Sequence, residues 1–485
     1  MGGTASKRAD DELFFLTLAE AARLLKGRKI SPLELTEAVL GRIERLNPLL
    51  NAYLLVTADQ ARATARNSER EILHGDYRGP LHGIPICLKD NFYTRGVITT
   101  AGSQFLRNFI PRANSDVVAH LQEAGAVMLG KTNLHEFAYG VTSVNPHYGW
   151  VRNPWDETRI SGGSSGGSAA AVVAGLAYGS VGTDTGGSIR NPAALCGIVG
   201  LKPTYGLVSL NGVVPLALSM DHAGPMARTV RDAAILLDAI ARAAATTASS
   251  KKSVAPKRKA GPRYAASLDR PIKGLRLGWP ARGCYAGATP EVERAVNVAA
   301  RVLESEGAKL REISLDGVEA TVEAANVVAR AEALAYHAQA GYFPGRASEY
   351  GRDVKSHLQA ARKISALDYL RALGARDVLR GIFEGAFKNV DGILAPTLPV
   401  TAPLRDQDVV RLANGEESVR SVFIRFSRPA NFAGLPAVSV PCGFSDAGLP
   451  IGLQIIGPAW EDARVLQIAH AYERASGWHE KHPLL

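Results

Sequence analysis

Hydrophobic and polar positions near the start of the chain repeat with the period of an α-helix. Apolar side chains recur on one face of residues 18–25, directly after a capping-box pair formed by Thr17 and Glu20. Residues 32–46 continue in the same way after Ser31, with proline at the first helical position and glutamate at the third. This pattern predicts two amphipathic helices at the beginning of the fold.

Shorter and uninterrupted apolar runs follow these helices. Residues 84–88 and 126–129 are too short for helices and suit buried strands, and a helical segment, 116–123, lies between them. Helices that alternate with buried strands are typical of an α/β protein. Later in the chain the pattern predicts helices at 168–177, 290–306, 365–387 and 462–474, and a hairpin at 437–440 and 451–456.

The composition agrees with a globular protein. The chain has 485 residues, of which 46% are hydrophobic and 21% charged. No apolar run is long enough to cross a membrane, so we expect no membrane partner. The four cysteines form no Cys-x-x-Cys pair, which argues against a thiolate metal site and against a disulfide framework. We therefore expect a reducing, cytoplasmic location and no metal site.

The net charge of +10 requires an explanation, because such a charge can indicate nucleic-acid binding. Residues 251–273 alone contribute +7 of this charge, in a segment that is also rich in Ala, Ser and Pro. A basic run of this composition is most simply a solvated loop. We therefore expect no nucleic-acid partner.

Two segments rich in glycine and serine contain the candidate chemistry. Residues 161–168 have the sequence Ser-Gly-Gly-Ser-Ser-Gly-Gly-Ser, and residues 182–190 contain a second Gly-Gly-Ser. Glycines allow backbone N–H groups to converge on an anion, as the oxyanion of a serine-dependent reaction requires. One such segment is equally well explained as a structural loop. Two of them, so close in sequence, favour a functional site.

Two other interpretations of these segments fit less well. Residues 162–166 match G-x-S-x-G, but that nucleophile elbow follows a hydrophobic strand, and residues 153–159 do not have the pattern of one. A phosphate-binding loop ends in Gly-Lys-Ser/Thr, which neither segment contains.

Lys89 directly follows the predicted strand 84–88. Such a lysine is most often a surface charge or an ion-pair partner, in this case of Asp90. An ordinary lysine has a pKa of about 10.4 and is almost entirely protonated at pH 7. Burial against the strand would lower the pKa and allow Lys89 to act as a base.

Several motifs together resemble the amidase signature family. Residues 83–90 resemble its lysine strand, residues 162–171 its serine- and glycine-rich stretch, and residues 182–194 its nucleophile loop. The separations from Lys89 to Ser164 and from Ser164 to Ser188 are similar to those of the family. The resemblance is dense over 81–230, returns over 431–466, and is diffuse elsewhere.

The resemblance implies a catalytic triad and no cofactor. Ser188 would be the nucleophile, Ser164 would relay a proton after a cis peptide bond to Gly163, and Lys89 would be the base. Backbone N–H groups would bind the oxyanion, and these belong to Thr185, Gly186, Gly187 and Ser188.

Supporting roles are expected for three further residues. Ser165 is expected to form hydrogen bonds near the triad, and Asp184 and Arg190 to form an ion pair that braces the nucleophile loop. In an alternative interpretation Arg190 binds a substrate carboxylate, which would favour acidic amides.

The fold implied by the resemblance is α/β, with one large mixed β-sheet of about eleven strands covered by helices on both sides. Within this single amidase domain we expect five parts. They are an N-terminal helical segment (1–75), a catalytic core (76–245), an exposed basic loop (246–273), a variable helical substrate lid (274–430) and C-terminal strands with a helix (431–485). Homodimers are common in the family, so a homodimer is one expected assembly.

The predicted function is cleavage of C–N bonds in small amides through an acyl-enzyme. The variable segments 142–150, 211–221 and 324–428 are expected to face the substrate. Their apolar character favours bulky or aryl amides and anilides, and also carbamates or esters. The aromatic candidates for lining this pocket are Tyr336, Tyr342, Phe343, Phe423 and Phe426.

Two alternatives to this function remain open. The first half of the chain also resembles the glutaminase (A) subunit of glutamyl-tRNA(Gln) amidotransferase. The Asn- and Arg-containing stretch of that protein does not follow residues 331–333, which favours a stand-alone amidase. The second alternative is a catalytically silent scaffold subunit. The intact Lys89, Ser164 and Ser188 argue against it.

Overall fold

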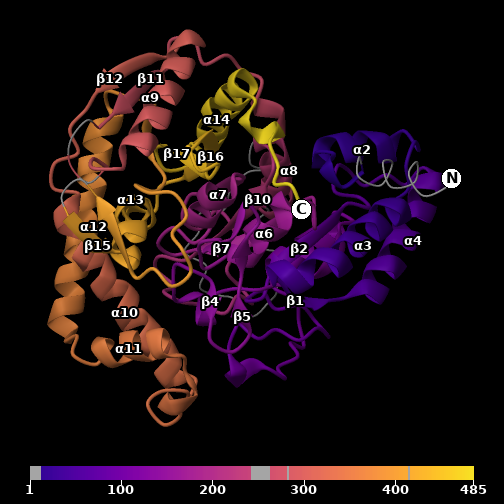
Figure 1. Cartoon of the computed structure of the whole chain (residues 1–485), viewed down its shortest axis with the longest axis horizontal. Coiled ribbons are helices and arrows are strands. Elements are labelled where there is room, and N and C mark those ends of the chain that lie inside the picture. Colours follow the sequence, from indigo (N-terminus) through magenta and orange to yellow (C-terminus); the bar gives the residue numbers. More distant parts are fainter. Residues whose placement is uncertain (1–12, 242–262, 281–282, 284, 413–414) are drawn as a thin grey trace.

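The computed structural model describes residues 13–241, 263–280, 283, 285–412 and 415–485. Its central feature is one sheet of eleven strands, flanked by helices, which confirms the expected fold class (Figure 1). In spatial order the strands are β1 (Tyr53–Val56), β3 (Val127–Thr132), β2 (Pro85–Lys89), β8 (Gly179–Asp184), β10 (His222–Ala227), β9 (Val199–Lys202), β16 (Ala437–Phe444), β17 (Pro450–Ile456), β13 (Gly392–Pro396), β11 (Arg276–Trp279) and β12 (Lys309–Glu312).

The sheet is mixed in a regular way. The strands β3, β2 and β8 are parallel neighbours, and so are β13, β11 and β12. Between these two groups, from β8 to β13, every neighbouring pair is antiparallel. Two-stranded ribbons lie outside the large sheet, and they are β4 (Val144–Asn145) with β5 (Gly149–Trp150), β6 (Arg152–Asn153) with β7 (Asp156–Ile160), and β14 (Val409–Leu412) with β15 (Gly415–Ser418).

Helices occupy both the periphery and the interior, where every residue of Gly166–Val173 and Arg190–Cys196 is buried. Figure 1 places α2–α4 on one side of the molecule and α10–α12 on the opposite side. The α-helices that lie wholly within the described residues are α2 (Leu18–Lys26), α3 (Pro32–Leu50), α4 (Ala58–His74), α5 (Asp116–Glu123), α6 (Gly166–Val173), α7 (Arg190–Cys196), α8 (Val230–Ile240), α9 (Pro290–Ser305), α10 (Val322–Gln339), α11 (Arg352–Ala361), α12 (Ala366–Phe387), α13 (Val419–Ala433) and α14 (Asp462–Ser476).

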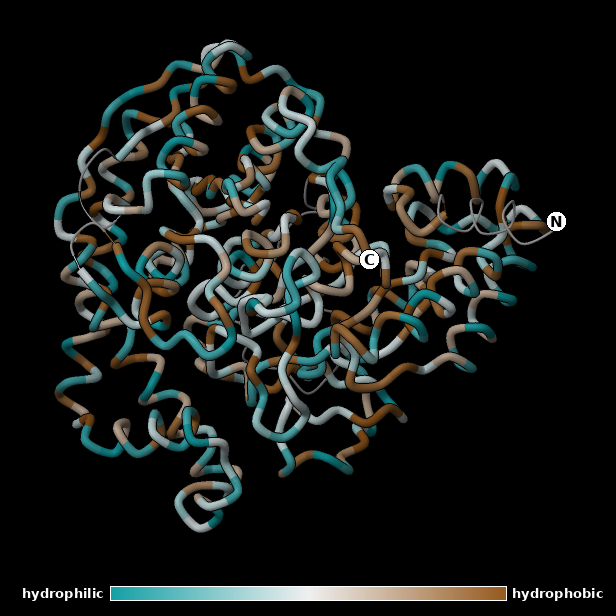
Figure 2. Tube along the Cα trace, viewed as in Figure 1, coloured by the Kyte–Doolittle hydropathy of each residue, from teal (hydrophilic) through white to brown (hydrophobic). Residues whose placement is uncertain are grey.

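Local sequence explains where several helices begin. Thr17 and Glu20 form a reciprocal capping box at the start of α2, and the residues predicted for its apolar face are buried. Ser31 and Glu34 do the same for α3. Figure 2 shows hydrophobic and hydrophilic positions alternating at short intervals along these peripheral helices, as amphipathic helices require.

The parallel pairing of β2 and β8 positions the candidate site. Both strands are fully buried, and Cys87 pairs with Ser180 in their register. Because the carboxyl ends of parallel neighbours lie at the same edge of the sheet, Lys89 at the end of β2 is brought beside the end of β8. The loop with the second Gly-Gly-Ser begins there.

Some sequence predictions need correction. Residues 156–160 do form a strand, β7, which pairs with β6 and forms a single bridge from Arg159 to Leu404. It has exposed polar residues, so its pattern was not that of a buried strand. The helix predicted at 168–177 occupies Gly166–Val173, and Gly175, with a φ of +70°, follows its end. The region 274–430 is not only helical, because it contributes β11, β12 and β13 to the large sheet.

The predicted basic loop at 246–273 falls mostly outside the described residues. Its described end, from residue 263, is not uniformly exposed. Tyr264, Leu268 and Ile272 are buried in the main hydrophobic core, because apolar side chains alternate there with the basic ones. None of the helices formed by the described residues is both long and apolar enough to span a bilayer.

Candidate active site

Lys89 lies at the centre of the candidate site and is fully buried. Its Nζ donates hydrogen bonds to Ser164 Oγ at 2.8 Å and to Thr183 Oγ1 at 2.8 Å. Burial lowers the pKa of Lys89 to about 7, although the negative charges of Asp184 and Asp221 act in the opposite direction. The ion pair with Asp90 that the sequence allowed does not form, because Asp90 pairs with Lys131 at 3.0 Å.

The first glycine- and serine-rich segment reaches the site at its cis peptide bond. This bond joins Gly163 to Ser164, as the family resemblance implied. The next residue, Ser165, connects the two serine loops, because its N–H donates to the carbonyl oxygen of Ser188 at 3.2 Å. Its hydroxyl donates to the carbonyl oxygen of Thr183 at 3.2 Å, so Ser165 contacts both sides of the site.

Asp184 and Arg190 form a fully buried ion pair with an N–O distance of 3.0 Å. Asp184 also accepts hydrogen bonds from the N–H groups of Gly187 at 2.7 Å and Ile189 at 3.2 Å. Burial opposes the ionisation of Asp184, but Arg190 and the other donors hold its pKa below the ordinary value. The pair therefore fixes the curvature of the loop.

Arg190 is not available to a substrate. Its side chain is completely buried, and it donates to Gln454 Oε1 at 2.5 Å and to Asn431 Oδ1 at 2.6 Å in addition to Asp184. The alternative interpretation, in which Arg190 binds a substrate carboxylate, is therefore wrong. Its guanidinium is already surrounded by acceptors from the core of the protein.

One of the four expected oxyanion donors is occupied in this structure. The N–H of Gly187 donates to Asp184, so it does not point at an empty position. Among the described residues, the N–H groups of Thr185, Gly186 and Ser188 have no hydrogen-bond acceptor. These three groups remain the candidates for an oxyanion, and Gly187 supplies the turn through its φ of +116°.

Ser188 itself is 9% exposed, the most accessible of the three triad candidates. Its hydroxyl has no hydrogen-bond partner among the described residues, and Ser164 Oγ is bonded to Lys89 instead. A free, partly accessible hydroxyl beside unpaired backbone donors has the chemical features of a nucleophile.

The three segments expected to face the substrate all contact the serine loops. Ser143 Oγ, from the first segment, accepts a hydrogen bond from the N–H of Gly166 at 3.1 Å. Asp221, from the second, accepts from the hydroxyl of Thr185 at 2.5 Å. Ser427, from the third, donates to the carbonyl oxygen of Gly186 at 2.7 Å.

The aromatic residues of these segments belong mainly to hydrophobic clusters. Phe423 and Phe426 are fully buried, and Phe343 is 4% exposed, so these three rings are core residues. Tyr336 and Tyr342 are partly buried against the cluster that also contains Phe343. The expected aromatic pocket is therefore not supported at Phe343, Phe423 or Phe426.

Three residues that contact the site were not identified from the sequence. Thr183 accepts a hydrogen bond from Lys89, Asp221 holds Thr185, and Arg428 lies against Gly186. Thr183 lies within the nucleophile-loop motif, directly before Asp184, and this position in the sequence could have indicated that it contacts the site. Asp221 and Arg428 are distant in sequence from the serines, and only tertiary packing brings them together.

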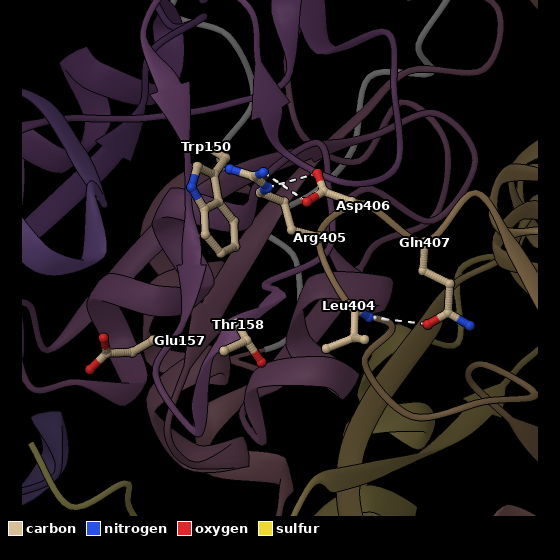
Figure 3. Close-up of a pocket in the computed structure, with 7 residues that line it drawn as sticks. All are labelled: Trp150, Glu157, Thr158, Leu404, Arg405, Asp406 and Gln407. Atoms are coloured by element: carbon tan, nitrogen blue, oxygen red, sulfur yellow. Dashed lines mark hydrogen bonds and ion pairs between the residues drawn. The ribbon is translucent and has the colours of Figure 1, made fainter.

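A surface depression of 490 Å³ lies elsewhere, between β5, β7 and residues 404–407 (Figure 3). Figure 3 shows Trp150 next to Arg405, whose guanidinium lies 5.3 Å from the indole ring and pairs with Asp406 at 2.7 Å. No triad candidate lines this depression, so it does not serve the chemistry of the serine loops. The described residues contain no cluster of three or more His, Cys, Asp or Glu side chains suited to a metal ion.

A lysine bonded to one serine, beside a second glycine-rich serine loop on a large mixed sheet, is the arrangement of an α/β enzyme of the hydrolase class. The chain belongs to the amidase family, whose family model, described as Amidase, matches residues 34–466. The protein is thus an enzyme that acts on carbon–nitrogen bonds other than peptide bonds.

Individual relatives cover nearly the whole chain. The A subunit of the glutamyl-tRNA(Gln) amidotransferase of Roseiflexus sp. (strain RS-1) is 43% identical over 490 residues, which cover 96% of this chain and 98% of the relative. Two solved structures have the same fold. One, described as a vestigial protein complex that reveals the origins of an s-triazine catabolic enzyme, has a TM-score of 0.88 and 32% identity. The match covers 95% of this chain and 98% of that one. The other, a bacterial aryl acylamidase of the amidase signature family, has a TM-score of 0.86 and 27% identity. This match covers 97% of this chain and 99% of that one.

Proposed function

We propose that the protein is a serine amidohydrolase in which Ser188 is the nucleophile, Ser164 relays protons and Lys89 is the general base. The observation that carries this proposal is the 2.8 Å contact between Lys89 Nζ and Ser164 Oγ. Since burial lowers the pKa of Lys89 to about 7, a large fraction of the side chain is neutral near neutral pH and accepts a proton.

The proposed acylation step uses these three side chains in order. Neutral Lys89 takes the proton of Ser164, Ser164 takes the proton of Ser188, and Ser188 Oγ forms a bond to the amide carbonyl carbon. The carbonyl oxygen becomes an oxyanion. When the tetrahedral intermediate collapses, the C–N bond breaks, the relay returns a proton to the nitrogen, and the products are a free amine or ammonia and an acyl ester on Ser188.

Deacylation uses the same groups. Water attacks the acyl ester while the relay accepts one of its protons, and the C–O bond to Ser188 then breaks. The proton returns to Ser188, and a carboxylic acid leaves. During both steps the N–H groups of Thr185, Gly186 and Ser188 would stabilise the oxyanion, and one such donor typically contributes about 10²–10³ in kcat.

The similar proteins favour glutamine as the first substrate to test. Relatives named as the A subunit of glutamyl-tRNA(Gln) amidotransferase include one that is 43% identical across nearly its whole length. The aryl acylamidase, whose name supports the aryl amides and anilides expected from the sequence but not the carbamates or esters, is 27% identical. We therefore rank glutamine hydrolysis, as part of an amidotransferase, above aryl-amide hydrolysis, which was the main expectation from the sequence.

This ranking has consequences for partners and location. A relative named as one subunit of an enzyme, and a structural neighbour described as a protein complex, support a protein partner for this chain in preference to a homodimer alone. The cytoplasmic location expected from the cysteines is part of the same proposal. The silent-scaffold alternative predicts that Ser188 does not react.

The test is release of amine or ammonia from glutamine, an aliphatic amide, an aryl anilide and an aryl carbamate. Wild type and Ser188→Ala are assayed side by side, and Lys89 variants follow. We expect turnover of at least one substrate that falls by about 10⁴-fold or more in Ser188→Ala, because the nucleophile is lost. Equal turnover by both proteins would overturn the proposal. Turnover of glutamine alone would favour the amidotransferase reading, and turnover of the anilide or carbamate a stand-alone amidase.

A further inference from the structure

Arginine side chains gather beside the nucleophile loop. Arg420 and Arg428 lie two turns apart on α13, and Arg330 lies on α10, which packs against α13. The closest approach is at Gly186, where a Cβ would lie only 2.7 Å from Arg428 Nε. Arg428 is therefore in direct contact with one of the residues proposed to bind the oxyanion.

The guanidinium of Arg428 is only partly satisfied. Arg428 is 6% exposed, and one of its terminal nitrogens donates to Asn326 Oδ1. Its Nε is buried and has no acceptor among the described residues. A buried donor without an acceptor is destabilising, so the position is unfavourable unless something else accepts that hydrogen bond.

Nearby carboxylates balance the charge of the cluster only in part. Arg330 pairs with Glu323 at 3.1 Å, whereas Arg420 lies 5.5 Å from the ring centre of Tyr139 and has no carboxylate partner among the described residues. The other acid in this region, Asp353, is held by two histidines. Burial and the neighbouring charge of Arg420 lower the pKa of Arg428 to about 9, so Arg428 is still charged at pH 7.

We infer that Arg428, together with Arg420, binds a carboxylate group of the substrate, so that the preferred substrates are small amides that also carry a carboxylate. This inference rests on the proposed function and specifies its substrate class, of which glutamine is one member. A carboxylate matches the planar fork of N–H donors on arginine and would satisfy Nε of Arg428. A neutral aryl amide would leave that donor unpaired.

The competing explanation is that Arg428 only supports the loop at Gly186. Such a structural role predicts equal losses for charged and neutral ligands when the arginine is replaced. A binding role predicts a loss for anions alone. A ligand comparison therefore separates the two explanations, and Arg420, which is not in contact with Gly186 in the structure, offers a second variant in case Arg428 variants fail to fold.

The experiment measures how ligands protect Ser188 from phenylmethylsulfonyl fluoride, a neutral reagent that sulfonylates an active serine. The labelled serine is identified by mass spectrometry. The ligands are the dicarboxylates malonate, succinate, glutarate and adipate, with 1,5-pentanediol as a neutral counterpart of glutarate. Wild type, Arg428→Gln and Arg420→Gln are compared with Arg425→Gln, which removes an arginine from the same helix that pairs with Glu417 at 2.8 Å.

In wild type we expect at least one dicarboxylate to slow the labelling by about tenfold and the diol to have no effect, because only the anion accepts from the arginine fork. Protection should disappear in Arg428→Gln and Arg420→Gln and persist in Arg425→Gln. Labelling without protection by any dicarboxylate, or protection that persists in both of the first two variants, would overturn the inference and leave the nucleophile assignment intact. A wild type that is not labelled at Ser188 would overturn the proposed function itself.

Discussion

Among the three lysines buried in the described part of the chain, Lys89 differs by its partners. Lys131 pairs with Asp90, and Lys202 donates to the carbonyl oxygens of Pro203 and Leu435. Lys89 donates to two hydroxyl groups and has no carboxylate in contact. Lys89 therefore differs from Lys131 in lacking an ion-pair partner and from Lys202 in donating to hydroxyl groups, one of which, Ser164 Oγ, can pass on a proton.

The pH dependence of activity tests this residue. Because the neutral form of Lys89 is required and its pKa is about 7, kcat/KM should rise about tenfold per pH unit below that value and level off above it. Lowering the pH protonates Lys89 and removes the base, so kcat/KM decreases as the pH falls. The measurement is the pH profile of kcat/KM for the best substrate found. A profile that is flat between pH 5 and 7 would contradict the assignment, and Lys89→Met should have little activity at any pH.

The buried ion pair of the loop gives a prediction for stability. Asp184→Asn leaves Arg190 buried and charged without its carboxylate, so the free energy of unfolding should fall by about 3–5 kcal/mol. Urea denaturation measures this change. As a control, Asp406→Asn removes the partner of Arg405 from an exposed pair and should have a much smaller effect, because solvent screens this pair. Similar losses for both variants would show that burial of the pair is unimportant.

At the scale of elements, the candidate site is built where two parallel strands end. β2 supplies Lys89, β8 supplies Thr183 and Asp184, and the loops that follow or precede short helices supply the serines. The backbone conformation of the loop after β8 depends on Gly187, whose φ is +116° and whose Cβ position would lie 2.2 Å from Ser427 Oγ.

Gly187→Ala should therefore disturb the nucleophile loop. We expect kcat/KM to fall by about 10²-fold or more, because a shift of about 1 Å in a catalytic group has an effect of that size. Gly206→Ala is the matched control, since Gly206 also has a positive φ, +79°, but its Cβ would meet no atom within 4 Å. The control should retain activity within about threefold, because its strain is local. If both variants are equally active, the loop is not as tightly packed as the structure indicates.

The start of α12 offers a test of helix capping. Ser365 accepts a hydrogen bond from the N–H of Asp368 at 3.1 Å, and Asp368 accepts from the N–H of Ser365 at 3.0 Å. Ser365→Ala should lower the free energy of unfolding by about 1 kcal/mol. Thr289 occupies the same position before α9 without a side-chain cap, so Thr289→Ala should cost less. Denaturant titrations of both variants measure the difference, and the reverse order would contradict the capping argument.

At the scale of the whole molecule, one hydrophobic core extends from Phe14 to Tyr472 and includes residues from nearly every strand of the large sheet. The N-terminal helices and the C-terminal helix α14 therefore share a core with the catalytic elements. Unfolding of the protein exposes to water the titratable groups that this packing buries.

His337 gives a global prediction of this kind. It is 1% exposed, accepts or donates one hydrogen bond with the hydroxyl of Tyr350 at 2.8 Å, and has a pKa lowered by burial to about 4. In the unfolded chain the pKa of this histidine is about 6.5. Between pH 6.5 and pH 4 the unfolded state therefore binds more protons than the folded state, and the free energy of unfolding decreases as the pH falls. Wild type should therefore lose more stability than His337→Gln between pH 6.5 and 4. Parallel pH curves of the unfolding free energy would contradict this.

Much of the fold was predictable because local patterns have local causes. The helices at Thr17, Ser31 and Ser365 begin at capping residues, and the strand before Lys89 is a continuous apolar run. β7 was missed because its residues are polar and several of them are exposed. β11, β12 and β13 were missed because each has only four or five residues, too few to show a clear period. In the site, Lys89, Ser164 and the Asp184–Arg190 pair were identified, but the hydrogen bond that occupies the Gly187 N–H was not.

The sequence by itself determined the chemistry that is local to a few residues: which segments form helices, where glycines permit a tight loop, and which serines and lysine belong to the amidase motifs. Tertiary structure alone decided the rest. It buried Lys89 away from water, which lowers the pKa of its amine, and it surrounded the Arg190 guanidinium with hydrogen-bond acceptors from the core. It also brought Asp221 and Arg428 against loop residues that lie more than thirty positions away in the sequence. The burial of a side chain and its hydrogen-bond partners are set by the packed chain. The free energy of a charge depends on the solvent, dipoles and charges around it in space and not on its neighbours in sequence.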